Sequence, residues 1–247
     1  ERQEEIDNFV PEEFWKIEGI HNVQNIEFKS LYYGEYENKK IVKKEIKNEK
    51  EALKVVEKTD KDNFIVEDVK KVKKERKPQP PFTTSTLQQE AGRKLGFSSS
   101  MTMSIAQQLY EGVSLGRSGS VGLITYMRTD STRISASAQN EASEFIEKEF
   151  GKDYCLATKR TVKNAEGAQD AHEAIRPSSV LRTPDSIASY LTKDQLKLYT
   201  LIWSRFVASQ MTAAVYDTVQ VDLEQNNHVF KANGSTIKFA GYQKVYQ

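Results

Sequence analysis

The chain has 247 residues, of which 38% are hydrophobic and 29% charged, with 36 lysines and arginines against 35 aspartates and glutamates. No stretch reaches the roughly 20 apolar residues that a membrane-spanning helix needs. A single cysteine, Cys155, excludes an internal disulfide and a paired-cysteine zinc site. We therefore expect a cytoplasmic protein. Because the chain begins without a methionine or a signal-like segment and stops after a strand-like pattern, we expect a piece of a longer polypeptide.

The first 81 residues alternate between strand-like runs and turn residues. Strands are predicted at residues 15–20, 25–33, 41–46 and 64–72, with a short helix at 49–57. Lysines are frequent at 39–50 and again at 70–77; they suit solvated strand faces at least as well as phosphate contacts, and we do not count them as site residues. The prolines at positions 78, 80 and 81 disfavour helix and mark a domain boundary.

The middle of the chain, residues 82–211, is predicted to be a helical domain. From Thr86 the apolar residues recur at helical spacing up to Gly96, and Ser98 to Ser100 can cap a second helix that reaches Tyr110. This pair resembles a helix-turn-helix. Further helices are predicted around residues 136–146 and 196–211, and the glycine- and serine-rich segment 112–122 is predicted to be a flexible surface loop.

The last segment, residues 212–247, returns to strand-like alternation. A strand at 219–223 is followed by a turn at 225–227 and by a second strand from Val229, and Asn233-Gly234 is a hairpin signal before 237–239. Neither flank has enough strands for an independent sheet. We therefore predict an α+β fold in which residues 1–81 and 212–247 form one discontinuous β-rich domain that the helical domain interrupts.

The most informative segment is residues 122–133 (GLITYMRTDSTR), which places Tyr126 two positions before Arg128 at the end of an apolar run. A phenol is a poor nucleophile because its unperturbed pKa is about 10, so a reactive tyrosine needs nearby cations. Arg128 offers a permanent charge and a planar fork that suits phosphate oxygens. Tyr-x-Arg alone is weak evidence in a chain with 11 tyrosines.

The string at residues 123–131 (LITYMRTDS) resembles the active-site segment of type IA DNA topoisomerases. Three further strings resemble the same family in the family's order: 9–15 (FVPEEFW) the opening of its arch, 81–91 (PFTTSTLQQEA) the start of its tyrosine domain, and 168–177 (AQDAHEAIRP) its histidine motif. Methionine at position 127 is typical of the bacterial topoisomerase I branch. The resemblance implies a toroidal enzyme whose arch and tyrosine domain are contained here.

The resemblance also implies a mechanism. Tyr126 would attack a phosphodiester of single-stranded DNA, forming a 5′-phosphotyrosine link and releasing a 3′-hydroxyl. Strand passage and rejoining would then relax negative supercoils without a nucleotide cofactor. Arg128 would stabilise transition-state charge, unless it pairs with Asp130, which is expected to orient it or to cap the adjoining turn. His172 would bind the scissile phosphate or the DNA backbone, and Glu173 would form a structural ion pair with Arg176, three residues away as in a helix.

Other parts of such an enzyme are implied to lie outside this sequence. The family binds Mg²⁺ through an Asp-x-Asp-x-Glu string in a separate toprim domain, and this string does not occur here. We therefore predict no metal ligand in the chain, and we expect it to depend on the toprim and gate domains of the same monomeric polypeptide and not to relax DNA alone.

The sequence leaves two alternatives open. The first is a noncatalytic helix-turn-helix module in which Tyr126 is a core or stacking residue and the helix at residues 100–110 reads the major groove of a duplex. Topoisomerase ancestry instead predicts a preference for single strands. The second is a tyrosine recombinase or type IB enzyme, whose dispersed arginine, lysine and histidine set does not match this order of motifs.

Overall fold

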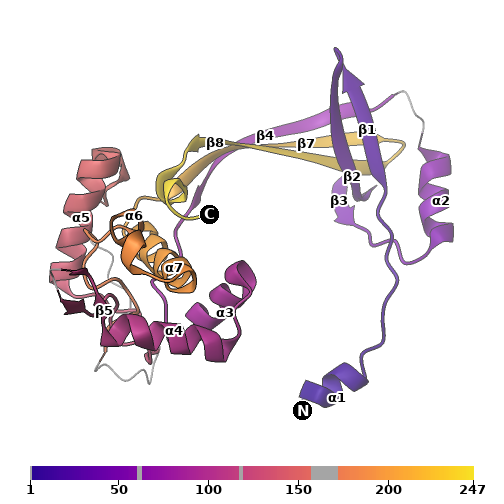
Figure 1. Cartoon of the computed structure of the whole chain (residues 1–247). Helices are drawn as coiled ribbons and strands as arrows, with labels where there is room; N and C mark the ends of the chain where they lie inside the picture. Colours follow the sequence, from indigo (N-terminus) through magenta and orange to yellow (C-terminus); the bar gives the residue numbers. More distant parts are fainter. Residues whose placement is uncertain (1, 60–62, 117–118, 157–171) are drawn as a thin grey trace. The chain divides into compact units, whose positions relative to one another are not determined.

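The computed structural model describes residues 2–59, 63–116, 119–156 and 172–247 and has two compact units (Figure 1). The β unit comprises Glu1–Lys74 and Tyr216–Ile237, and the helical unit comprises Glu75–Val215 and Lys238–Gln247. The chain passes between the units three times, each time within a long strand: β4 (Ile65–Arg76), β7 (Ala214–Gln225) and β8 (His228–Phe239). The predicted α+β fold is confirmed.

One antiparallel sheet joins the two flanks of the sequence. Its order is β1-β2-β8-β7-β4, with β3 paired to β2; the new strands are β1 (Glu18–Val23), β2 (Ile26–Glu37) and β3 (Lys40–Lys43). Strand β2 pairs with β8, with Leu31 opposite Lys231. Strands from both ends of the chain therefore belong to a single sheet. Two helices complete the unit, α1 (Arg2–Asp7) and α2 (Glu49–Lys58), the latter capped by Asn48.

Three two-residue turns connect neighbouring strands of this sheet, at residues 24–25, 38–39 and 226–227. Both residues of each turn have positive φ, between 49° and 71°, which is the requirement of a type I′ hairpin and explains the asparagine in every one. The predicted hairpin at Asn233-Gly234 is wrong. Strand β8 runs through both residues, because the turn that reverses the chain is already made at 226–227.

The β unit has a small buried core. Ile46, Ala52 and Val55 are buried, and Tyr32 packs against them. A row of edge-to-face rings continues from Tyr32 to Phe230 and on to Phe64, with centroid separations of 5.6 and 5.3 Å. Such aromatic pairs bury much area for few residues.

The helical unit contains the elements between β4 and β7. They are α3 (Thr84–Leu95), α4 (Ser99–Glu111), α5 (Ala136–Phe150), η2 (Lys152–Tyr154), α6 (Pro184–Ile187), η3 (Ala188–Tyr190) and α7 (Lys193–Ser209). Side-chain caps begin the long helices, with reciprocal capping boxes at Thr83 and Thr192. Gly96 ends α3 in the left-handed conformation, at φ 70°. The short turn predicted between the first two helices is confirmed.

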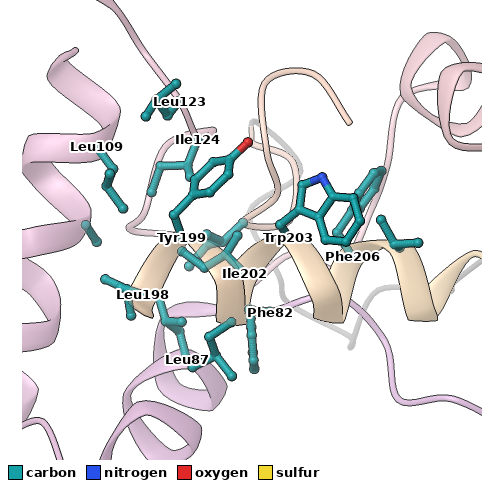
Figure 2. Close-up of a cluster of buried hydrophobic side chains, with 14 of the residues drawn as sticks. Phe82, Leu87, Leu109, Leu123, Ile124, Leu198, Tyr199, Ile202, Trp203 and Phe206 are labelled. Atoms are coloured by element: carbon teal, nitrogen blue, oxygen red, sulfur yellow. The ribbon is translucent and has the colours of Figure 1, made fainter. Parts of the chain in front are cut away.

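Helix α7 forms the centre of the hydrophobic core of this unit (Figure 2). Leu198, Tyr199 and Ile202 are fully buried and pack among side chains from α3, α4 and the tyrosine segment. Two polar groups of α7 donate to backbone carbonyls: the Tyr199 hydroxyl to Arg182 at 2.7 Å, and Trp203 Nε1 to Val180 at 2.9 Å. These two hydrogen bonds therefore fix the segment around residues 180–182 on α7.

Two sequence assignments need correction. The segment 112–122, predicted to be a flexible loop, contains a small hairpin of β5 (Val113–Ser114) and β6 (Ser120–Val121); residues 117–118 lie outside the described residues. Residues 238–247, assigned to the β-rich domain, belong to the helical unit. The cause is the turn η4 (Gly241–Lys244) and the residues after it, which pack on α7, where the Arg205 guanidinium lies over the Tyr246 ring at 5.3 Å.

Candidate active site

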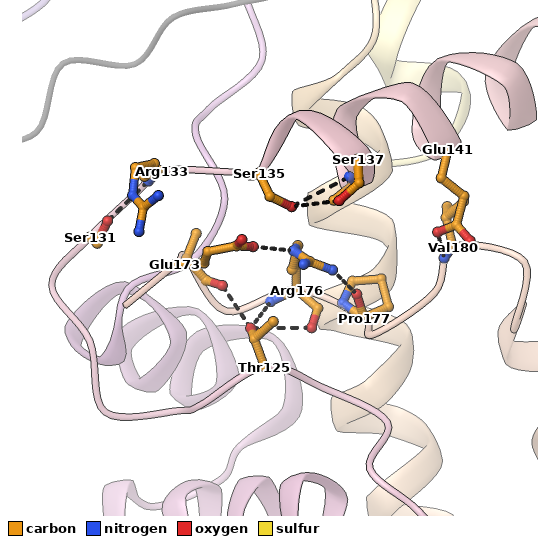
Figure 3. A network of polar contacts seen from close by, with 12 residues as sticks. Thr125, Ser131, Arg133, Ser135, Ser137, Glu141, Glu173, Arg176, Pro177 and Val180 are labelled. Atoms are coloured by element: carbon orange, nitrogen blue, oxygen red, sulfur yellow. Dashed lines mark hydrogen bonds and ion pairs between the residues drawn. The ribbon is translucent and has the colours of Figure 1, made fainter. Parts of the chain in front are cut away.

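Tyr126 lies in a non-helical segment that is held on its N-terminal side by residues 174–178. The Thr125 hydroxyl donates to the Ala174 carbonyl at 2.7 Å and accepts from the Arg176 N–H at 3.0 Å (Figure 3). The Thr125 N–H donates to the Arg176 carbonyl at 2.9 Å. A single threonine therefore joins the tyrosine segment to the histidine motif through both its backbone and its side chain.

The C-terminal side of the segment is held by the first residue of α3. The Thr84 hydroxyl lies 2.8 Å from the Met127 carbonyl and accepts from the Thr129 N–H at 2.9 Å. The Thr84 N–H donates to the Thr129 carbonyl at 2.9 Å. Met127 is buried, so its side chain anchors the segment between the two residues that the sequence singled out, Tyr126 and Arg128.

The two segments that hold the Tyr126 segment, around residues 82–84 and 174–178, are also joined to each other. The Ile175 N–H donates to the Phe82 carbonyl at 2.8 Å, and both residues are fully buried. Three of the strings singled out in the sequence, around residues 82–86, 123–131 and 172–177, are therefore brought together by backbone hydrogen bonds. Residues 168–171 of the histidine motif lie outside the described residues.

The ring of Tyr126 is half-buried and lies against two other rings. The His172 ring lies 4.9 Å away, centroid to centroid, at an interplanar angle of 44°, and the Tyr110 ring lies 5.4 Å away at 65°. His172 itself is exposed. The structure thus brings together Tyr126 and His172, which are 46 residues apart in the chain. Tyr110 was not predicted, because nothing in its local sequence distinguishes it from a residue at the end of an amphipathic helix.

Arg128 and Asp130 are both exposed, and within the described part of the chain no ion pair or hydrogen bond joins them. The adjoining turn is capped by two other side chains instead of Asp130: the Thr129 hydroxyl accepts from the Ser131 N–H, and the Ser131 hydroxyl accepts from the Arg133 N–H, each at 3.1 Å. Ser131 therefore caps the backbone of this turn. The cap expected from Asp130 is not formed, because the Thr129 and Ser131 hydroxyls accept these N–H groups.

Glu173 and Arg176 form the predicted ion pair, at 2.7 Å between Arg176 Nε and the Glu173 carboxylate, but in an extended segment and not in a helix. Arg176 also donates to the Pro177 carbonyl at 2.9 Å. Burial alone would raise the pKa of Glu173; the hydrogen bond and charge of Arg176, with hydrogen bonds from Ser135, outweigh burial and lower this pKa. Ser135 also caps α5, so its hydrogen bonds to Glu173 tie the histidine motif to that helix.

Comparison with known proteins places this arrangement in a family. Residues 1–247 match the model of a DNA topoisomerase family. The chain belongs to that family. The structure of full-length topoisomerase I from Thermotoga maritima, in a monoclinic crystal form, is 40% identical with a TM-score of 0.79, and the match covers 100% of this chain and 38% of that chain. These matches identify a bacterial type IA topoisomerase, and the chain spans about two fifths of the length of that relative.

Neither a metal centre nor a membrane segment is found in the described ranges of this topoisomerase chain. No three histidine, cysteine, aspartate or glutamate side chains come together there as ligands for a metal ion. No described helix has both the length and the hydropathy needed to cross a membrane.

Proposed function

We propose that this chain carries the nucleophile of a type IA topoisomerase and that Tyr126 is that nucleophile. The observation that supports it best is the position of the Tyr126 ring, which is half-buried on a segment fixed from two sides and lies against an exposed histidine. A nucleophile held by backbone hydrogen bonds approaches a phosphate with little loss of conformational freedom. The Tyr126 hydroxyl would attack a phosphodiester of single-stranded DNA, forming the 5′-phosphotyrosine and releasing the 3′-hydroxyl.

Arg128 supplies a positive charge, and both Arg128 and His172 supply exposed hydrogen-bond donors. Arg128 is exposed and has no ion-pair partner among the described residues, so its five N–H donors can be directed at phosphate oxygens. His172 can donate one hydrogen bond to a phosphate oxygen from its exposed ring. Arg128 would therefore stabilise charge in the transition state, and His172 would hold the DNA backbone beside Tyr126.

The remaining functions would come from other parts of the same polypeptide. The chain spans 38% of its Thermotoga relative, so strand passage, DNA gripping and Mg²⁺ binding are assigned to a toprim domain and a gate domain outside these residues. Rejoining exchanges one phosphodiester for another and needs no ATP. The enzyme would act in the cytoplasm as a monomer on single-stranded segments of negatively supercoiled DNA.

A noncatalytic helix-turn-helix module is supported less well. Helix α4, which would enter the major groove, contains no lysine or arginine, whereas phosphate contacts normally supply much of the affinity for a duplex. Its residues Thr102, Ile105 and Leu109 are buried in the core of the helical unit. A strong preference of the enzyme for duplex over single-stranded DNA would favour this alternative.

The test is a graded series of variants of the complete enzyme, assayed by trapping the covalent adduct with a single-stranded oligonucleotide. Tyr126→Phe keeps the ring and removes the reacting oxygen, so we expect no adduct and near-normal DNA binding. Arg128→Lys keeps the charge and loses the fork, which should cost about 10² to 10³ in rate. His172→Ala loses one hydrogen bond to a charged group, about 1.5–3 kcal/mol, and should affect binding or cleavage less.

Two outcomes would contradict this assignment. If Tyr126→Phe still gave a 5′-linked adduct, another tyrosine would be the nucleophile. If the purified 247-residue chain relaxed supercoiled plasmid in the presence of Mg²⁺, the assignment of metal binding and strand passage to other domains would be wrong.

A further inference from the structure

Tyr110, at the end of α4, lies directly against Tyr126 and has no part in the function proposed above. The two rings meet edge to face, with centroids 5.4 Å apart. The side chain of Tyr110 is 41% exposed, so burial in the core does not account for its position. An edge-to-face contact leaves the second face of a ring available to another aromatic group.

Backbone contacts fix Tyr110 relative to the tyrosine segment. The Leu123 N–H donates to the Leu109 carbonyl at 2.7 Å. Gly122 approaches the last turn of α4 so closely that an added Cβ would lie 2.7 Å from the Tyr110 carbonyl oxygen. Glycine, which has no Cβ, is the residue that fits here without this clash. The end of α4 and the start of the Tyr126 segment therefore form one rigid piece, and the distance between the two tyrosine rings is a property of the fold.

The chemistry around Tyr110 favours a base over a phosphate. Helix α4 has no lysine or arginine, and the Tyr110 hydroxyl makes no hydrogen bond to any described residue. Exposed aromatic rings are the surfaces on which proteins stack the bases of single strands, and they do so with little regard to base identity. Tyr110 thus offers a flat, uncharged surface next to the position where the phosphate would react.

We propose that Tyr110 is a positioning residue on which one base of the cleaved DNA strand stacks, so that a neighbouring phosphate is held at the Tyr126 hydroxyl. This inference rests on the function proposed for Tyr126. The two rings lie 5.4 Å apart, so the base on Tyr110 belongs to a nucleotide close to the cleaved bond.

The test removes one base at a time from the substrate of the complete enzyme. A single abasic nucleotide is moved through each position on both sides of the cleavage site, and the trapped covalent adduct is measured. In the wild type we expect one position at which the abasic substitution lowers the adduct by roughly 5- to 100-fold. Tyr110→Leu should cleave the intact strand more slowly by a similar factor, and an abasic nucleotide at that position should not lower its adduct further. Tyr110→Phe should keep the wild-type profile.

A matched control and an independent signal complete the test. Tyr190 is 47% exposed and makes no ring contact with Tyr126 in the described structure, so Tyr190→Leu should retain the wild-type profile. A 2-aminopurine base at the sensitive position reports stacking without cleavage. Its fluorescence should be quenched by the wild type and by Tyr126→Phe, but not by Tyr110→Leu.

The outcomes separate the two proposals. Tyr110→Leu could lower the adduct by the same factor with every substrate and keep the sensitive position of the wild type, or it could quench 2-aminopurine as the wild type does. Either result would show that Tyr110 only supports the fold and that the stacking proposal is wrong. If no adduct forms with any oligonucleotide, the function proposed for Tyr126 fails. In that case 2-aminopurine placed at each position in turn still decides whether a base stacks on Tyr110, by quenching that the wild type shows and Tyr110→Leu lacks.

Discussion

The hydroxyl of Thr84 is expected to control the position of Tyr126 from a different part of the sequence. It lies 2.8 Å from the Met127 carbonyl and accepts from the Thr129 N–H at 2.9 Å, on the two residues that flank Arg128. Thr84→Val keeps the shape of the side chain and removes both interactions. The backbone hydrogen bond from the Thr84 N–H to Thr129 remains, so the segment is loosened but not released.

The magnitude follows from the two lost hydrogen bonds. Each contributes about 0.5–1.5 kcal/mol, so the free energy of unfolding should fall by about 1–3 kcal/mol. The site is only partly buried, and water can satisfy some of the freed groups, which favours the lower half of this range. Because a displacement of about 1 Å can cost 10²-fold in rate, adduct formation should fall by about 10- to 100-fold.

Thr86→Ala is the matched control, since Thr86 lies in the same first turn of α3 but does not touch the tyrosine segment. Its hydroxyl accepts from the Thr83 N–H at 2.9 Å in the capping box, and its loss should cost about 1 kcal/mol. Urea unfolding gives the stability of each variant, and trapping with single-stranded DNA gives the adduct rate. Equal adduct rates for Thr84→Val and Thr86→Ala at similar stability would show that Thr84 does not position Tyr126.

Two further predictions concern stability. Gly122→Ala places a Cβ 2.7 Å from the Tyr110 carbonyl oxygen and should lower the free energy of unfolding by about 1–3 kcal/mol. Gly234→Ala, whose Cβ meets no atom within 4 Å, should change this free energy little. Equal urea midpoints of the two variants would contradict this prediction. Burial lowers the pKa of His228 below 6.5 against the opposing charge of Glu35, so the unfolded chain binds more protons as the pH falls past that value, and stability falls with it. His228→Gln should therefore flatten the decline measured between about pH 7.5 and pH 5.5, and an unchanged slope would refute this role.

Local signals determined much of the architecture. Side-chain caps at Ser98, Ser135 and Thr192 and the left-handed Gly96 set helix ends within a few residues of the predicted ones, because capping depends on neighbours three residues away. The sequence also predicts the turn at Asn226-Asn227, because this signal too depends only on neighbouring residues. Asn233-Gly234 carries an equally strong signal and lies inside β8, since a hairpin also needs two strands that face each other, and this depends on pairing far along the chain.

The helical spacing of Leu87 and Ala91 determined which face of α3 is buried, and the string around Tyr126 determined the family and the candidate nucleophile. The sequence could not determine which distant segments meet. Contacts between residues well separated in the chain decide the pairing of β2 with β8, the packing of residues 238–247 on α7, and the placement of His172 and Tyr110 against Tyr126. Such contacts are stabilised by the shared core and by hydrogen bonds between segments, such as those of Thr84 and Thr125, which leave no periodic pattern in the sequence.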